Sequence, residues 1–299
     1  MTKWYIQYPI NTHCNLMCSY CFHKEQHKSG IYQDRCGFTI KEYQQWRDKF
    51  LSDAEEILIS LTGGETFDIR NQDEVDLILK LFNKEKFDLL TNGISPTHRY
   101  EHLEKYKHKI KRIGCTFHGT QLNEHQKELF IHNVLILKEM GFNVYVKELL
   151  MHQHRQNTLN NIQFWKNKGI EVKCQDFRPD GTHTAPYDQI DIAMIDNEYK
   201  HLGTECYCRD GYRNLIFLGY GSKPDFKTDG DVLGCWRDQC VIGNIKQMWF
   251  NPEYIVKRNH MIYGYDIANV PKLYRGTYFR GSDPTKPNTD TKEYYDELQ

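Results

Sequence analysis

The sequence has no long uncharged apolar run and no excess of charge of one sign. Over 299 residues, 39 Lys and Arg side chains face 40 Asp and Glu side chains. No apolar run approaches the roughly 18 residues of a membrane helix, and the opening MTKWYIQYPI lacks the basic and apolar segments of an export signal. These absences argue against a membrane protein and a secreted protein, so we expect a cytoplasmic one.

The sequence also offers little to attract nucleic acid. The basic run EHLEKYKHKIKR at 101–112 could form such a patch, but balanced overall charge favours a solvated helical face instead. We therefore do not expect nucleic acid or a membrane as a partner.

Cysteine, in contrast, is frequent, with ten in the chain. Without an export signal these thiols belong in a reducing compartment, where clustered cysteines bind metal more often than they pair. Their spacing must decide which of them do so.

Strand-like and helix-like segments alternate through the first 180 residues. Strands are predicted at 3–10, 55–65, 86–93, 112–119, 143–151 and 170–177, and helices at 39–51, 72–83, 123–141 and 157–169. Thr39 and Glu42 form a capping-box pair, and Gly141 and Gly169 are placed to end helices. This rhythm predicts an α/β fold, a partial (β/α)6 TIM-like barrel with chemistry at the C-terminal ends of its strands.

The rhythm stops after about residue 180. We expect a barrel at 1–180, a connecting segment at 181–205, a small α+β auxiliary metal-binding module at 206–250, and a C-terminal extension with a partly ordered tail at 251–299.

The segment NTHCNLMCSYCFHKEQ places three cysteines within eight residues, at Cys14, Cys18 and Cys21. Such spacing lets a short loop surround one inorganic cluster. A closed zinc site needs a fourth ligand, which His13 or His23 could supply, and unrelated buried thiols are the other alternative.

The Cys14-x3-Cys18-x2-Cys21 spacing, with aromatic Tyr20 before the third cysteine and a strand before the motif, resembles the signature of the radical SAM superfamily. The resemblance implies a [4Fe–4S] cluster held by three thiolates, with an open site for S-adenosylmethionine (SAM). It further implies cleavage of SAM to a 5′-deoxyadenosyl radical, with electrons from an external donor such as flavodoxin or ferredoxin.

LTGGE supports the resemblance, because Gly63, Gly64 and Glu65 end the second predicted strand. Glycines let backbone approach a ligand closely, and a carboxylate can meet an ammonium group. A plain glycine turn is the alternative, whereas the family's GGE motif implies a clamp for the SAM amino group.

Weaker candidates follow the next two strands. Asn92 ends the third, and Thr116 and His118 end the fourth, where the family places polar residues near SAM or substrate; ordinary turn-forming roles are equally compatible. Lys147, Glu148, Gln175, Asp176 and Arg178 could point into the barrel or out of it.

A second cysteine group lies around a predicted hairpin with a turn at Asp229 and Gly230. Gly230-x4-Cys235 and the later IGNI resemble the start of a SPASM or twitch extension, which implies an auxiliary [4Fe–4S] cluster, with zinc as the alternative. Since no cysteine follows Cys240, at most one such cluster is supported. The candidate ligands are Cys206, Cys208, Cys235 and Cys240.

Three cysteines remain: Cys36, Cys115 and Cys174. Burial as small apolar side chains is the default. A sharper hypothesis makes Cys174, or one cysteine of the second group, a hydrogen-atom donor to a substrate radical.

The leading hypothesis is therefore a radical SAM enzyme that abstracts hydrogen from a small peptide or small molecule. Within the family an auxiliary module favours maturation of a ribosomal peptide by crosslinking, epimerisation or oxidation. Oxidation or epimerisation of a sugar-like natural product, modification of RNA or a nucleotide, and a zinc-stabilised binding protein without radical chemistry are the alternatives.

Overall fold

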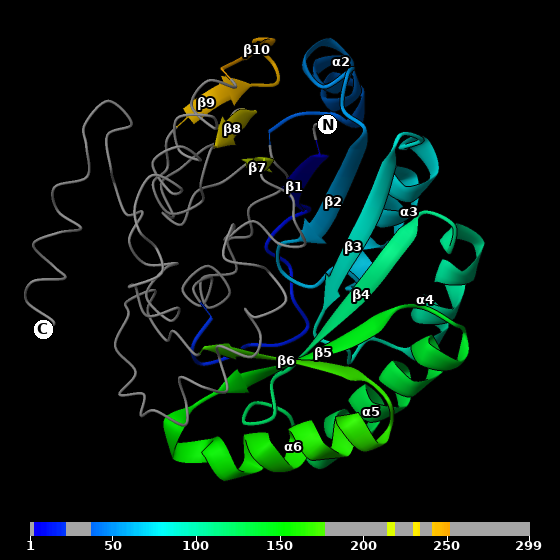
Figure 1. The fold of residues 1–299 in the computed structure, drawn as a ribbon, viewed down its shortest axis with the longest axis vertical. Helices are drawn as coiled ribbons and strands as arrows, with labels where there is room; N and C mark the ends of the chain where they lie inside the picture. Colours follow the sequence, from blue (N-terminus) through cyan, green and yellow to red (C-terminus); the bar gives the residue numbers. More distant parts are fainter. Residues whose placement is uncertain (1–2, 22–36, 177–213, 219–229, 234–240, 252–299) are drawn as a thin grey trace, which may run out of the picture.

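A computed structural model describes residues 3–21, 37–176, 214–218, 230–233 and 241–251. Six parallel strands form the main sheet, in the order of the sequence (Figure 1). They are β1 (Lys3–Pro9), β2 (Glu56–Thr62), β3 (Glu85–Thr91), β4 (Ile110–Phe117), β5 (Val144–Leu150) and β6 (Glu171–Asp176). This confirms the predicted strands and the α/β barrel class.

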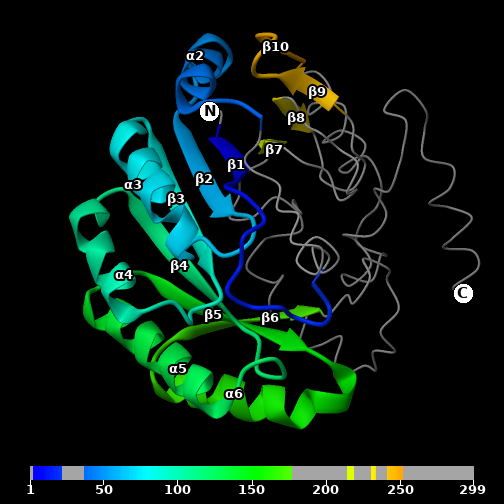
Figure 2. The same ribbon diagram turned by 180° about the vertical axis from the view of Figure 1, so that it is seen from behind.

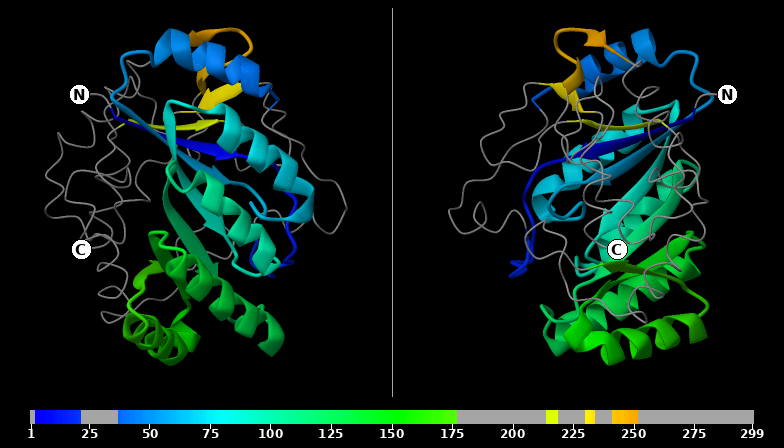
Figure 3. Two further views of the ribbon diagram at one scale, coloured as in Figure 1. Left: turned by 90° about the vertical axis from the view of Figure 1, so that its right-hand side faces the viewer. Right: turned by 60° about the vertical axis from the view of Figure 1, so that its left-hand side comes forward.

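Helices cover the convex face of this sheet, as Figures 2 and 3 show. The main core lies between the two layers and includes Ile59, Phe87 and Val146, all fully buried. The helices are α2 (Ile40–Phe50), α3 (Gln72–Leu81), α4 (Thr97–Glu101), α5 (Glu124–Glu139) and α6 (Arg155–Asn167), with 3₁₀ turns at Ile69–Asn71, His102–Tyr106 and His152–His154.

Local signals set the helix ends as predicted. Thr39 and Glu42 form the capping box of α2. Gly141 follows α5 with φ +76°, and the Phe142 N–H bonds to the Leu137 carbonyl at 3.1 Å, so a left-handed glycine closes the helix. No helix among the described residues is long and apolar enough to cross a membrane.

The sheet extends past β1 through segments distant in sequence. β7 (Asn214–Leu218) pairs parallel with β1, and β8 (Asp231–Leu233) pairs antiparallel with β7, which confirms the antiparallel pairing of the predicted hairpin; Asp229 of its predicted turn lies outside the described residues. β9 (Val241–Asn244) and β10 (Trp249–Phe250) follow, antiparallel. The hairpin thus continues the barrel sheet, a pairing that the sequence did not indicate.

An aromatic cluster fixes this extension to α2. The Trp46 ring lies 5.0 Å from Phe250, and the Trp46 indole N–H donates to the Trp249 carbonyl at 3.2 Å. Trp4 of β1 also contacts Phe250, with 5.7 Å between ring centroids. Edge-to-face contacts of this kind add to the apolar burial.

The basic run at 101–112 is largely engaged within the fold. Arg112 pairs with buried Asp88 at 2.7 Å, Lys111 pairs with Glu56 at 2.9 Å, and Lys109 donates to the Leu79 carbonyl at 2.7 Å. These cations connect the segment at 109–112 to α3, β2 and β3, because each reaches a partner outside its own segment.

Candidate functional site: a cysteine loop on three strand ends

The cysteine loop begins as a continuation of the barrel sheet. Beyond the last residue of β1, the Ile10 N–H donates to the Thr62 carbonyl at 2.8 Å. The Gly64 N–H donates to the Asn11 carbonyl at 2.7 Å, and the Glu65 N–H donates to the His13 carbonyl at 2.6 Å. The ladder therefore holds the two sequence motifs side by side, directly before Cys14.

This close approach explains both glycines. A Cβ on Gly63, whose φ is +129°, would lie 2.3 Å from the Asn11 carbonyl oxygen, and one on Gly64 would lie 1.9 Å from that of His13. Any side chain would separate the two segments. The backbone that approaches these glycines belongs to the chain itself, whereas the sequence had suggested a ligand.

Glu65 lies beneath this junction, 1% exposed. Its carboxylate accepts from the Thr91 hydroxyl at 2.6 Å, from the Asn92 N–H at 2.6 Å and from the Phe67 N–H at 2.9 Å. Burial raises the pKa of this carboxyl to about 7 although these donors oppose the shift. Glu65 thus joins the ends of β2 and β3.

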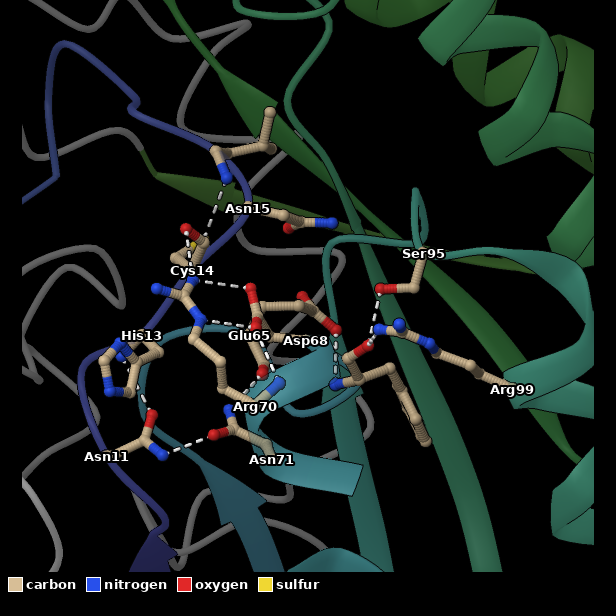
Figure 4. A network of polar contacts seen from close by, with 12 residues as sticks. Asn11, His13, Cys14, Asn15, Glu65, Asp68, Arg70, Asn71, Ser95 and Arg99 are labelled. Carbon is tan, nitrogen blue, oxygen red and sulfur yellow. Dashed lines mark hydrogen bonds and ion pairs between the residues drawn. The ribbon is translucent and has the colours of Figure 1, made fainter. Parts of the chain in front are cut away.

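A polar network fixes the loop from the side of α3 (Figure 4). Arg70 binds both oxygens of Asp68, at 2.7 and 2.8 Å, and reaches the Cys14 carbonyl at 3.4 Å. Asn71 donates to the Glu65 carbonyl at 2.7 Å and accepts from Asn11. Sequence patterns do not reveal these residues, because isolated polar side chains in loops form no recognisable pattern.

Asn92, a predicted site residue, reaches the loop from the end of β3. Its amide nitrogen donates to the Asn15 side-chain oxygen at 2.7 Å and lies 3.7 Å from Cys14 Sγ. The structure thus brings Asn92 against the first cysteine.

The end of β4 holds the other half of the loop. His118 Nδ1 and the Tyr20 hydroxyl share a hydrogen bond of 2.7 Å, and their rings stack with centroids 5.9 Å apart. Gln121 accepts from the Ser19 N–H at 2.9 Å. Burial lowers the pKa of His118 to about 4, so the ring is neutral at physiological pH. Both contacts fall between the second and third cysteines.

The three thiols lie in one loop and influence one another. Burial raises the pKa of Cys14 to about 12, with the Glu65 carboxylate next in effect, and burial and Cys21 raise that of Cys18 to about 11. Within the described residues, no three His, Cys, Asp or Glu side chains already form a metal site. The donor set nevertheless fits an iron–sulfur cluster. Three soft thiolates, with no fourth protein ligand in the motif, suit a cluster that keeps one coordination position open. The loop would have to close around such a cluster.

The remaining predicted residues occupy different places. Thr116 pairs in register with Lys147 of β5. Cys115 is 1% exposed within the main core, which confirms its burial. Cys174 is buried and pairs in register with Glu148, whose carboxylate bonds to α6. That face is directed to the helices, which does not support hydrogen donation to a substrate in the barrel; the role stays a prediction.

The second cysteine group, Cys206, Cys208, Cys235 and Cys240, lies outside the described residues, as do Cys36 and Arg178. The auxiliary cluster and its zinc alternative therefore stay predictions.

A cavity of about 260 Å³ borders the cysteine loop. Tyr20 lines it together with residues from the ends of β4 and β5 and from α6, among them Phe117, Glu148, Met151 and Asn161. Glu148 accepts from the Trp165 indole N–H at 3.1 Å and from Asn161 at 3.2 Å, and burial raises its pKa to about 8. The cavity thus combines aromatic and apolar walls with polar groups.

The chain shares its partial-barrel fold with solved structures, two of them AdoMet-bound, that are only distantly similar in sequence. No family model and no curated protein matches the sequence. A tagged form of anSMEcpe with bound AdoMet is similar over 92% of this chain and 84% of its own, with a TM-score of 0.62 and 13% identity.

Two further solved structures share the fold. Native anSMEcpe with bound AdoMet and the Cp18Cys peptide has a TM-score of 0.58 and 14% identity, over 92% of this chain and 88% of its own. The methylornithine synthase PylB has a TM-score of 0.52 and 12% identity, over 91% of this chain and 86% of its own. At these identities the likeness concerns the fold.

Proposed function

We propose that this protein is a radical SAM enzyme. One observation carries the proposal: the loop with Cys14, Cys18 and Cys21 is bound to the C-terminal ends of three neighbouring barrel strands. In barrels of this kind catalytic residues gather at that edge. The shared fold, with two AdoMet-bound neighbours, supports the same conclusion.

The three thiolates would hold a [4Fe–4S] cluster. When bound, such a cluster supplies the electron that cleaves SAM to methionine and a 5′-deoxyadenosyl radical. An external one-electron donor such as flavodoxin or ferredoxin would restore that electron.

The surrounding residues position this loop. Asn92 holds its first part through Asn15, while Gln121 and His118 hold Ser19 and Tyr20. The cavity beside Tyr20 offers an aromatic wall and buried hydrogen-bonding groups, which suit the nucleoside part of SAM. Glu65 supports the loop from below. We also propose that its carboxylate binds the amino group of SAM, as the GGE resemblance implies.

For the substrate we propose a small peptide, modified by crosslinking, epimerisation or oxidation. A neighbour of the same fold is described with a bound peptide, which supports this class. An auxiliary cluster on Cys206, Cys208, Cys235 and Cys240 would provide a route for an electron from an oxidised peptide.

The test is anaerobic reconstitution with iron and sulfide, followed by SAM and dithionite. We expect about four or more irons per chain and release of 5′-deoxyadenosine. Alanine at Cys14, Cys18 and Cys21 should abolish 5′-deoxyadenosine release, whereas the matched variant Cys115→Ala should retain it. A colourless zinc-containing protein that leaves SAM intact would contradict the proposal.

A further inference from the structure

A chain of buried hydroxyl groups leads from α4 to the Glu65 carboxylate. The Thr91 hydroxyl, at the last residue of β3, donates to Glu65 Oε1 at 2.6 Å, and the Tyr100 hydroxyl of α4 lies 3.1 Å from the Thr91 hydroxyl oxygen. The Phe67 ring packs against the Tyr100 ring, with centroids 4.9 Å apart. Glu65, Thr91 and Tyr100 are all buried, so each of these polar groups depends on the others for its hydrogen bonds.

The neighbouring backbone fixes the direction of each proton in this chain. The Gly93 N–H donates to the Thr91 hydroxyl oxygen at 3.0 Å, and the Ser95 N–H donates to the Tyr100 hydroxyl oxygen at 3.3 Å. A hydroxyl has one proton and two acceptor positions. Because the Thr91 proton goes to Glu65, the second acceptor position of Thr91 receives the Tyr100 proton. The hydroxyl dipoles therefore both point toward Glu65, where they stabilise negative charge on the carboxylate.

The Glu65 carboxylate keeps one acceptor position open. Oε1 accepts from Thr91 and from the Phe67 N–H at 2.9 Å, whereas Oε2 accepts from the Asn92 N–H at 2.6 Å. A carboxylate has about four acceptor positions, so the remaining one belongs to Oε2. All three donors are neutral, and within the part of the chain that the structure describes no cation contacts Glu65. A buried carboxylate is rarely left without a positive partner, and an ammonium group at Oε2 would supply one.

We propose that Thr91 and Tyr100 are positioning residues, which hold Glu65 Oε2 ready for the amino group of SAM. The assignment rests on the proposed function, in which Glu65 binds that amino group. Thr91 fixes the carboxylate through Oε1 and leaves Oε2 available, and Tyr100 fixes the Thr91 hydroxyl. Both residues act through Glu65 alone. Their removal should therefore weaken the contact with the amino group and leave the rest of SAM bound as before.

Equilibrium dialysis of the reconstituted enzyme tests this proposal with two ligands, SAM and a SAM analogue in which hydrogen replaces the amino group. We expect Thr91→Val to weaken SAM binding about tenfold and Tyr100→Phe about threefold, with the affinity for the analogue and the iron content unchanged. Thr91→Ser keeps the hydroxyl and should bind SAM within about twofold of the parent. Tyr43→Phe is the control, because it removes the hydroxyl of another fully buried tyrosine, on α2, and should bind both ligands as the parent does.

Unchanged SAM affinity in Thr91→Val, or an equal loss for SAM and the analogue, would overturn the proposal. A parent that binds the analogue as tightly as SAM would overturn it too, because Glu65 would then make no contact with the amino group. Should Thr91→Val fail to fold, Tyr100→Phe decides in the same way. Release of 5′-deoxyadenosine is scored separately. A parent that binds SAM as expected but releases none would contradict the radical chemistry and leave the positioning role in place.

Discussion

Replacement of Glu148 by glutamine should change how the stability of the chain depends on pH. The carboxyl is 2% exposed, and burial raises its pKa from 4.5 to about 8. Between these values the folded state binds a proton that the unfolded state has released, so stability falls as pH rises. Glutamine keeps an acceptor for the Trp165 indole N–H and has no proton to lose.

The expected effect follows from the two pKa values. One pH unit corresponds to about 1.4 kcal/mol, so the free energy of unfolding of the parent should fall by about 3 kcal/mol relative to Glu148→Gln between pH 5 and pH 8. Urea unfolding of the cluster-free chain, followed by tryptophan fluorescence, measures it. Glu128→Gln, at an exposed position on α5, is the control and should show no such trend. A constant difference between parent and Glu148→Gln across this range would show that Glu148 does not take up a proton on folding.

Three further changes test the geometry of the site and one helix end. Gly64→Ala should lower the free energy of unfolding by more than about 2 kcal/mol, since its Cβ would lie 1.9 Å from the His13 carbonyl oxygen; an unchanged urea midpoint would contradict this. His118→Phe removes the hydrogen bond to Tyr20 and should weaken SAM binding about fivefold at unchanged iron content, as equilibrium dialysis would measure; equal affinity would count against a positioning role. Thr39→Ala should cost about 1 kcal/mol in urea unfolding through loss of the capping box, and no loss would remove that assignment.

Much of the fold was predictable from the sequence because its signals are local. Apolar periodicity located the six parallel strands, and the cap residues located the helix ends at Thr39 and Gly141. The pairing of β7 with β1 was not predictable, since the two strands lie some 200 residues apart and no local pattern encodes that contact.

The candidate site was only partly predictable, for a similar reason. Spacing identified Cys14, Cys18 and Cys21, but it gave no sign of Arg70 or Gln121, whose contacts with the loop exist only once the strands align. The inner or outer orientation of the β5 side chains also needed the structure, because alternation says only that neighbours face opposite ways.

The most direct test of the central claim is the amount of 5′-deoxyadenosine released from SAM by the reconstituted, dithionite-reduced protein. We expect release by the parent and by Cys115→Ala, and none by the variant with alanine at Cys14, Cys18 and Cys21. Equal release by the triple variant, or no release by a parent that holds its iron, would contradict it.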